Sequence, residues 1–310
     1  MYLSIIVPVF NEAKNIEKLY FELNCSLNIF KGTYEIILVD DCSTDSSLNI
    51  IKKLSEQDKN LKYISFNKNF GQTQAIAAGI DAAKGGLIVT LDADLQNPPE
   101  EIPKLVEKLE REHYDCVSGW RKHRKDDLKK KLFSRLSFLI RKLLFKDKIH
   151  DAGCTLKVYK KECFDDFEFY GESHRFITTI LQIKGFKVGE CVVKHKKRFA
   201  GKTKYGAKRL TKGFLDLIFI KFWNDFSTRP LHFFGNLALF QYSLVIILFV
   251  EQILNALIIS KFITGHFLLL GVLLFLTATL TLFLGFLSEM LIRSTTKSKR
   301  YKIKKLHRNI

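Results

Sequence analysis

The sequence lacks several features that would assign it to other protein classes. Its six cysteines form no CxxC pair and show no metal-ligand spacing, and scattered thiols of this kind fit a reducing cytosol. The N-terminal apolar run is short and contains Pro8. It has no basic region before it and no small-residue cleavage site, so we expect no signal peptide. These absences argue against a disulfide framework and a secreted chain.

Basic residues are abundant but unevenly spread, and the formal net charge is +18. Residues 121–146, 194–221 and 290–310 carry eleven, ten and eight Lys or Arg, against two, one and no acidic residues. Basic stretches beside apolar segments indicate an anionic partner surface, although each could also be a solvated face. The charge alone would allow a non-enzymatic binding protein for nucleic acid or anionic lipid.

Two long apolar segments near the C-terminus predict membrane-spanning helices, since a span needs roughly 20 residues. Residues 267–292 are charged only at Glu289, whereas residues 233–259 also contain Glu251 and several amides. A charge in the middle of a bilayer is costly, so we expect Glu251 near an interface or against another helix. The short connection favours a transmembrane hairpin over a buried hairpin of a soluble protein.

The flanks of this hairpin predict its orientation. Lys and Arg are frequent in the domain before it, residues 1–230, and in the tail, residues 293–310. By the positive-inside rule we expect a multi-pass protein of the cytoplasmic (inner) membrane with its first domain and both termini in the cytoplasm. Polar side chains such as Gln241 suggest helix association, and hence a homo-oligomer.

Residues 1–230 alternate between strand and helix signals. We expect strands at residues 4–9, 34–39, 63–66, 86–91 and 115–119, and helices at residues 11–27, 46–57, 72–83 and 103–112. Continuous apolar strands alternating with helices predict an α/β fold with a mostly parallel, Rossmann-like sheet covered on both faces. Ligands of such sheets bind at the carboxyl ends of the strands.

Acidic residues gather at those strand ends. Asp92 and Asp94 follow the fourth strand, and at this i, i+2 spacing both carboxylates can reach one ion. Mg²⁺ or Mn²⁺ takes oxygen ligands of this kind and would bind the diphosphate of a nucleotide sugar, with Gln96 as a third ligand or a phosphate contact. An isolated Asp-x-Asp is common by chance, but its place after a strand favours a metal site. Asp41, after the second strand, could accept hydrogen bonds from a base or ribose.

Basic residues in the second half suit phosphate groups. Arg121 follows the fifth strand, and its guanidinium can bind phosphate in bidentate fashion. Residues 128–146 combine basic and apolar residues at helical spacing, which is typical of an interfacial helix; a second such helix is expected at about 209–226. Within the first, Arg135 and Ser134 could hold an acceptor phosphate, or Arg135 could contact lipid headgroups generally. The basic loop 198–206 could close over a diphosphate or be simply flexible.

Together these motifs resemble family 2 glycosyltransferases of the dolichol-phosphate mannosyltransferase and bactoprenol glucosyltransferase type. The resemblance rests on six segments, at residues 8–12, 39–41, 69–72, 92–96, 171–176 and 198–205. It implies a GT-A fold, a nucleotide-diphosphate sugar donor, a polyprenyl phosphate acceptor and inversion at the anomeric carbon. By matched position it implies contacts to the nucleoside, the diphosphate and the metal from Pro8, Phe10, Glu12, Val39, Asp41, Asp92, Asp94, Gln96, Arg121, Arg198 and Lys204. Cys42 and the pair Lys202-Thr203 depart from the usual pattern.

The sequence therefore predicts a metal-dependent glycosyltransferase of the hexosyltransferase class. We expect it to use a UDP- or GDP-linked sugar, with glucose or mannose as the leading candidates, and an undecaprenyl or dolichyl phosphate acceptor at the cytoplasmic membrane face. A transferase for a modified sugar such as 4-amino-arabinose and a non-enzymatic membrane-bound scaffold are the alternatives. A processive polysaccharide synthase is disfavoured, because neither Trp120 nor Trp223 lies in a QxxRW motif. No nucleic-acid partner is expected.

Overall fold

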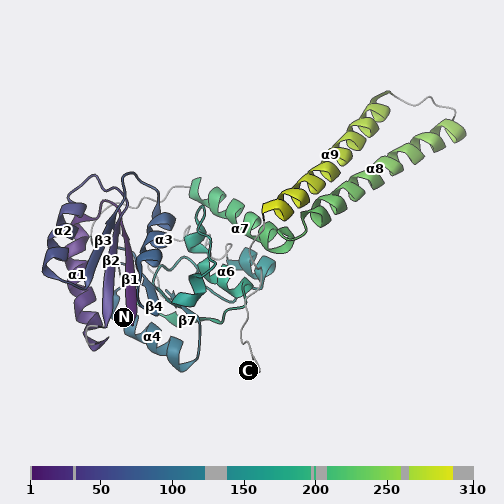
Figure 1. Ribbon diagram of the computed structural model, residues 1–310. Coiled ribbons are helices and arrows are strands. Elements are labelled where there is room, and N and C mark those ends of the chain that lie inside the picture. Colours follow the sequence, from purple (N-terminus) through teal and green to yellow (C-terminus); the bar gives the residue numbers. More distant parts are fainter. Residues whose placement is uncertain are drawn as a thin grey trace, which may run out of the picture. The chain divides into compact units, whose positions relative to one another are not determined.

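The computed structural model describes residues 2–30, 33–122, 138–196, 199, 208–259 and 265–295 (Figure 1). The chain divides into two compact units, Met1–Ile220 and Lys221–Ile310. The first unit contains the sheet, and the second contains two long apolar helices.

Seven strands form one sheet in the order β3-β2-β1-β4-β6-β5-β7. They are β1 (Leu3–Val9), β2 (Tyr34–Asp40), β3 (Leu61–Ser65), β4 (Leu87–Thr90), β5 (Cys116–Trp120), β6 (Lys157–Lys160) and β7 (Val188–Val192). β1 to β4 run parallel, β5 runs parallel to β7, and β6 is antiparallel to its neighbours β4 and β5. The predicted mostly parallel α/β sheet is thus confirmed.

Helices cover both faces of this sheet because its central strands are apolar on both sides (Figure 1). On one face, α1 (Ala13–Leu27), α2 (Ser47–Gln57) and α4 (Ile102–Arg111) contribute to one core. On the other face, α3 (Gln72–Ala82) and α6 (Ile177–Ile183) contribute to a second. In α4 the buried residues recur at the spacing of one helix face, at Ile102, Leu105, Val106 and Leu109.

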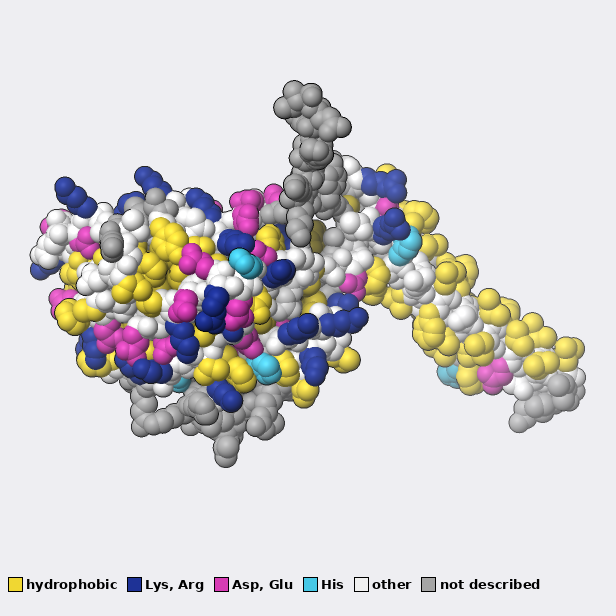
Figure 2. All heavy atoms as spheres, turned by 90° about the horizontal axis from the view of Figure 1, so that it is seen from below, with side chains coloured by type: hydrophobic (Ala, Val, Ile, Leu, Met, Phe, Trp, Pro, Cys, Tyr) yellow, Lys and Arg dark blue, Asp and Glu magenta, His cyan; other side chains and the backbone are white. Residues whose placement is uncertain are grey.

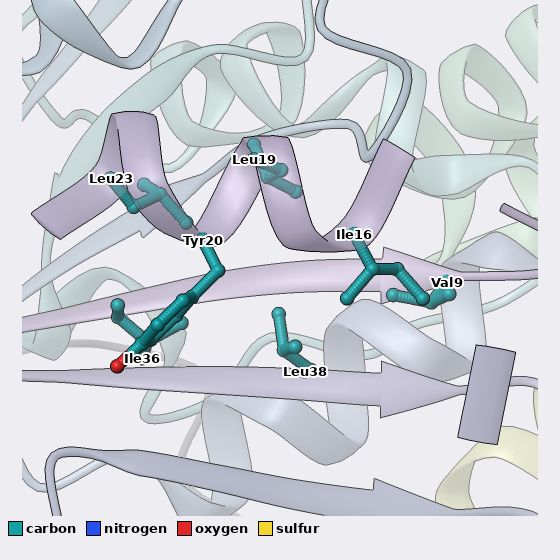
Figure 3. Close-up of a pocket in the computed structure, with 7 residues that line it drawn as sticks. All are labelled: Val9, Ile16, Leu19, Tyr20, Leu23, Ile36 and Leu38. Atoms are coloured by element: carbon teal, nitrogen blue, oxygen red, sulfur yellow. The ribbon is translucent and has the colours of Figure 1, made fainter. Parts of the chain in front are cut away.

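A small apolar pocket lies between α1 and the strands β1 and β2 (Figure 3). Its lining consists of Val9, Ile16, Leu19, Tyr20, Leu23, Ile36 and Leu38. None of the site residues predicted from the sequence lines it. The pocket is therefore part of the packing of helix on sheet.

The strand order reverses between β1 and β4. From β1 the chain builds β2 and β3 on one side and then places β4 on the other, where Ile6 pairs with Thr90. In open α/β sheets, ligand sites form at the carboxyl ends of strands where the order reverses in this way. The segments that follow β1 and β4, which carry Glu12 and Asp92, are therefore at the favoured position for a site.

The second unit contains a helical hairpin formed by α8 (Pro230–Ile259) and α9 (Gly265–Thr295). The two helices touch where Tyr242 and Thr279 share a hydrogen bond of 2.9 Å. Pro230–Leu257 and Gly265–Ser294 are long and apolar enough to cross a membrane. Their apolar side chains are mostly exposed, Leu257 at 75 %, and hydrophobic atoms cover the hairpin face seen in Figure 2. Exposure on this scale fits lipid contact and argues against the core hairpin of a soluble protein.

Candidate active site

Three tight turns shape the edge of the sheet where β1, β2 and β4 end. Asn11, Cys42 and Leu95 follow these strands closely and have positive φ angles of 54°, 60° and 60°. Asparagine tolerates this left-handed region, but for a bulky residue such as leucine it is costly. Backbone strain of this kind clusters at functional sites, where the surrounding structure holds it in place. The turns bring the acidic residues after the three strands to one edge.

The paired aspartates at the end of β2 are buried and have different partners. Asp40 accepts hydrogen bonds from the Ser43 backbone N–H at 3.3 Å and from the Ser65 hydroxyl at 3.4 Å. Asp41 accepts the backbone N–H groups of Phe70 and Gly71 at 2.7 and 2.9 Å, one on each oxygen. Burial raises the pKa of Asp41, and these two N–H groups only partly oppose it. The carboxylate of Asp41, which we predicted at the nucleoside, thus also holds the loop before α3.

That loop continues to the predicted metal motif. The side-chain amide of Gln72, the first residue of α3, donates to Oδ1 of Asp92 at 2.7 Å. Asp94 is 7 % exposed, and its Oδ1 accepts the backbone N–H of Gln96 at 3.0 Å. The carbonyl of Gln96 in turn accepts the backbone N–H of Lys196, just past β7, at 2.9 Å. Both carboxylates of the motif are therefore oriented by hydrogen bonds from their surroundings.

The donor set at Asp92 and Asp94 suits Mg²⁺ or Mn²⁺. Among the described residues no group of three His, Cys, Asp or Glu side chains could hold a metal ion, and the predicted pair of carboxylates is smaller than such a group. Mg²⁺ is commonly bound in this way, through one or two carboxylates with substrate phosphates and water completing the shell. Hydrogen bonds such as the one from Gln72 orient ligating carboxylates in metal sites.

Arg121, predicted to contact phosphate, forms a bidentate pair with Asp151. Its Nε and Nη2 donate to the two carboxylate oxygens at 2.7 and 3.0 Å, and its backbone N–H donates to Oδ2 at 3.2 Å. Both side chains are largely buried, at 14 % and 6 % exposure. The prediction from the sequence did not include Asp151, which has no local motif to mark it.

Asp151 belongs to a segment that lies against the metal motif. Thr155 of this segment accepts a hydrogen bond on its carbonyl from the Thr90 hydroxyl at 2.7 Å, and its own hydroxyl accepts one from the Asn97 side-chain amide at 3.2 Å. Thr90 ends β4, directly before Leu91 and Asp92. The structure therefore places the segment with Asp151 at the same edge as Asp92 and Asp94.

The residues predicted around the nucleoside lie close together. Pro8 on β1 and Val39 on β2 are paired in the sheet. The side chain of Val39 is fully buried in the core, so only its backbone is available to a ligand. Phe10 and Glu12 follow β1, and both are partly buried. The Glu12 carboxylate accepts a hydrogen bond from the side chain of Asn15.

Several predicted residues lie outside the described part of the chain. Ser134 and Arg135, expected at the acceptor phosphate, and Arg198 and Lys204, expected at the donor, belong to this group. Their roles stay predictions from the sequence.

The segment of residues 171–176, part of the resemblance but without an assigned role, contacts the start of α3. The Thr73 hydroxyl donates to the Gly171 carbonyl at 2.7 Å and lies 2.7 Å from Nδ1 of His174. Because Thr73 is the neighbour of Gln72, this contact connects residues 171–176 to the side chain that orients Asp92. The sequence alone carried no signal for this contact.

Comparison with known proteins identifies the family. Residues 4–167 match glycosyl transferase family 2. The chain is 37 % identical over 302 residues to a dodecaprenyl-phosphate galacturonate synthase of Rhizobium johnstonii, covering 94 % of this chain and 88 % of that protein. It is 36 % identical over 231 residues to an undecaprenyl-phosphate 4-deoxy-4-formamido-L-arabinose transferase of Shewanella sediminis, covering 74 % and 68 %.

Solved structures share the fold at low identity. Glucosyl-3-phosphoglycerate synthase from Mycobacterium tuberculosis, solved with Mn²⁺, uridine diphosphate and phosphoglyceric acid, superposes with a TM-score of 0.56 at 15 % identity, covering 72 % of this chain and 78 % of that one. TarS 1–349 of S. aureus in complex with UDP-GlcNAc gives a TM-score of 0.52 at 19 % identity, covering 73 % and 68 %. The predicted GT-A fold is thereby confirmed. The family match and the 37 % identity to the Rhizobium johnstonii relative show that the chain belongs to glycosyl transferase family 2 and is a glycosyltransferase.

Proposed function

We propose that this glycosyltransferase moves a sugar from a nucleotide-diphosphate donor to a polyprenyl phosphate at the cytoplasmic face of the membrane, with inversion at the anomeric carbon. The observation that carries the proposal is the oriented pair Asp92 and Asp94 at the reversal point of the sheet, in a chain that also has two exposed apolar helices. The similarity to a dodecaprenyl-phosphate and an undecaprenyl-phosphate transferase supports the acceptor class. The same similarity argues against a non-enzymatic scaffold.

The acceptor explains why a strong general base is unnecessary. A phosphate monoester has a second pKa of about 6, so its oxygen is already anionic and nucleophilic at neutral pH. That oxygen would attack the anomeric carbon from the side opposite the diphosphate. A new carbon–oxygen bond forms as the bond to the diphosphate breaks, and the diphosphate leaves with the electron pair. Positioning and charge stabilisation are then the tasks left to the protein.

The residues of the site divide these tasks. A divalent cation, when bound at Asp92 and Asp94, would neutralise charge on the leaving diphosphate. Gln72 holds Asp92 in the orientation to bind it. Arg121, oriented by Asp151, would contact a phosphate at the same edge. The backbone around Pro8 and Val39, with Phe10, Glu12 and Asp41, would contact the nucleoside.

Membrane contact would come from the hairpin and from surface helices of the first unit. Residues 138–145 are helical and belong to the predicted interfacial helix. Leu139 and Leu143 are exposed at 59 % and 83 %, whereas Arg141 is 2 % exposed and pairs with Asp147. Arg141 therefore has a structural role in the first unit. We propose that these exposed leucines enter the membrane interface. Leu215 of α7 (Lys208–Phe226), which is 62 % exposed, would do the same.

The sugar is the least constrained part of the proposal. Glucose and mannose were our leading candidates, but the names of the two relatives above specify galacturonate and 4-deoxy-4-formamido-L-arabinose. These similarities favour a modified sugar of that kind as a second candidate. Both classes of donor therefore belong in the same assay.

A donor panel tests the function directly. Membranes containing the full chain would be incubated with undecaprenyl phosphate, Mg²⁺ or Mn²⁺, and labelled UDP-glucose, GDP-mannose, UDP-galacturonate or UDP-4-deoxy-4-formamido-arabinose. We expect one donor to give a labelled lipid whose formation stops when the metal is chelated. Lipid labelling that is insensitive both to chelation and to the change Asp92→Asn would contradict the mechanism.

A homo-oligomer also remains part of the proposal. Glu251 is exposed on α8, and an exposed charge on a membrane helix is costly unless it has a partner. Cross-linking of the full chain in native membranes would show whether a second copy supplies one. Recovery of the monomer alone would argue against self-association.

A further inference from the structure

Glu190, in the middle of β7, binds the segment that carries Asp151. Its Oε1 accepts the backbone N–H groups of His150 and Asp151 at 2.7 and 3.1 Å, and its Oε2 lies 2.7 Å from Nδ1 of the His150 ring. The Glu190 side chain is 12 % exposed. One carboxylate thus fixes the backbone of residues 150 and 151 and the orientation of one imidazole. Glu190 lies beyond residues 4–167, the part of the chain that the family match covers.

The imidazole of His150 lies between two aromatic rings. Its centroid is 4.5 Å from that of Trp120 and 5.1 Å from that of Phe138, with interplanar angles of 14° and 17°. Trp120 is the last residue of β5, and Phe138 is the first described residue of the helix at 138–145. The stacked ring therefore connects the end of β5, immediately before Arg121, to the carboxylate on β7.

The sheet places these residues together. β5 and β7 are parallel neighbours in which Ser118 is paired with Glu190 and Trp120 with Val192. Side chains two residues apart on a strand point to the same face, so Glu190 and Trp120 project from the same side of the sheet. The His150 ring therefore meets both the Glu190 carboxylate and the Trp120 ring on that side.

We propose that Glu190 and His150 are positioning residues for phosphate recognition. By fixing the backbone of residues 150 and 151, they hold the Asp151 carboxylate where it orients the guanidinium of Arg121. Arg121 then meets the phosphate of a substrate in a fixed orientation, which reduces the cost of ordering it on binding. This inference rests on the proposed function only for the identity of that phosphate, which belongs either to the nucleotide sugar or to the lipid acceptor.

The decisive variants are Glu190→Ala and Glu190→Gln in the full-length protein. Alanine removes all three contacts, so we expect about a tenfold rise in KM for one of the two substrates, with kcat changed less. The substrate whose KM changes identifies the phosphate that Arg121 meets. Glutamine should restore nearly normal KM values, because its amide oxygen can accept both backbone N–H groups and its NH₂ can donate to His150. Glu100→Ala is the matched control, since Glu100 is 50 % exposed and pairs with Lys194 at the surface; it should leave both KM values unchanged.

A double-mutant cycle separates positioning from a general structural role. If Glu190 acts through Arg121, Glu190→Ala should raise KM less than twofold when Arg121 is already alanine. An equal tenfold rise in both backgrounds would overturn the proposal. So would a variant that unfolds at lower temperature but has unchanged KM values. His150→Phe, which keeps the stacking but loses the bond to Glu190, should fall between the wild type and Glu190→Ala.

A binding measurement keeps this inference separate from the proposed function. Calorimetric titration of the detergent-solubilised chain with UDP and Mn²⁺, and separately with undecaprenyl phosphate, needs no turnover. We expect Glu190→Ala to weaken one of these ligands by about tenfold. Unchanged affinity for both would contradict the positioning role. Absence of lipid-linked product from the wild-type protein would instead count against the proposed function.

Discussion

The two ends of strand β2 use carboxylates in opposite ways. Near its start, Glu35 is fully buried and accepts hydrogen bonds from the Ser4 hydroxyl and the Lys84 backbone N–H, each at 2.6 Å, and it pairs with Lys62. At its end, Asp40 and Asp41 lie beside each other, and the hydrogen bonds described for their carboxylates come from uncharged groups.

The difference reflects how charge is balanced at each end. The ammonium group of Lys62 neutralises the charge of Glu35, so the contacts at this end of the strand are structural. At the other end, the negative charges of Asp40, Asp41, Asp92 and Asp94 gather at the strand ends where a cation and a diphosphate would bind. Acidic residues gathered at the carboxyl ends of the strands lie at the position where ligands of open α/β sheets bind. The comparison predicts that mutations at the first end affect stability and those at the second end affect turnover.

The largest effect is expected at the metal motif. Asp92→Asn or Asp94→Asn should lower kcat by about a thousandfold, because each removes a negative oxygen ligand from the cation that stabilises the leaving group. Both variants should stay in the membrane fraction and unfold at nearly the wild-type temperature. Activity within a few fold of wild type would show that these carboxylates do not hold a catalytic metal.

The amino-terminal end should give a loss of stability instead. Glu35→Ala leaves the Lys84 N–H and the Ser4 hydroxyl without their buried acceptor, which should lower the free energy of unfolding by about 3 kcal/mol. Denaturant unfolding of the full chain in detergent measures this, with the exposed Glu56→Ala as control. Turnover per folded molecule should be unchanged. A loss of turnover at normal stability would contradict the division between the two ends.

The strands of the sheet were not equally predictable from the sequence. The apolar runs of β1, β2 and β4 predicted the parallel sheet because burial on both faces requires continuous apolar strands. β6 gave no such signal, since it has four residues and begins with Lys157. Lys157 is nevertheless buried, its ammonium group donates to the carbonyl of Ala152 at 3.0 Å, and burial lowers its pKa. A lysine in the sequence predicts an exposed position, and the burial of Lys157 becomes visible only from its tertiary contacts.

The site shows the same limit. Asp92 and Asp94 could be proposed from the sequence because two carboxylates at i, i+2 after a strand form a local pattern. Asp151, Glu190 and His150 could not, because their roles arise from contacts between distant parts of the chain. Glu190 and His150, for example, are 40 positions apart. The phosphate contact of Arg121 stays a prediction, and its carboxylate partner Asp151 became visible only in the folded chain.

A smaller effect is expected from the residue that orients the metal motif. Gln72→Ala removes the amide that donates to Asp92, and loss of such an orienting contact weakens metal affinity by about tenfold. The measurement is transfer rate against Mn²⁺ concentration, where the half-saturating concentration should rise while the rate at saturating metal stays close to wild type. The neighbouring Gln74→Ala, at an exposed position of α3, serves as control. An unchanged metal requirement would mean that Asp92 needs no such support.

The smallest effect concerns pH, and here the two ends should differ in sign. For Glu35, burial alone would raise the pKa, but the hydrogen bonds from Lys62, Ser4 and Lys84 outweigh it and lower the pKa from 4.5. Its ionised form therefore contributes stability above about pH 4.5 that is lost as the pH falls further. Burial raises the pKa of Asp41 above 3.8, so the folded chain binds this proton more tightly and loses stability as the pH rises through that range.

Melting temperatures of the wild type, Glu35→Gln and Asp41→Asn between pH 3 and pH 7 test this contrast. The advantage of the wild type over Glu35→Gln should shrink as the pH falls below about 4.5, because the ion pair with Lys62 is lost on protonation. The difference in melting temperature between the wild type and Asp41→Asn should instead shrink as the pH rises above about 4. Only the wild type then carries a buried charge at this position. If both differences in melting temperature followed pH with the same sign, the pKa values of Glu35 and Asp41 would be shifted in the same direction. The contrast between the two ends of β2 would then be wrong.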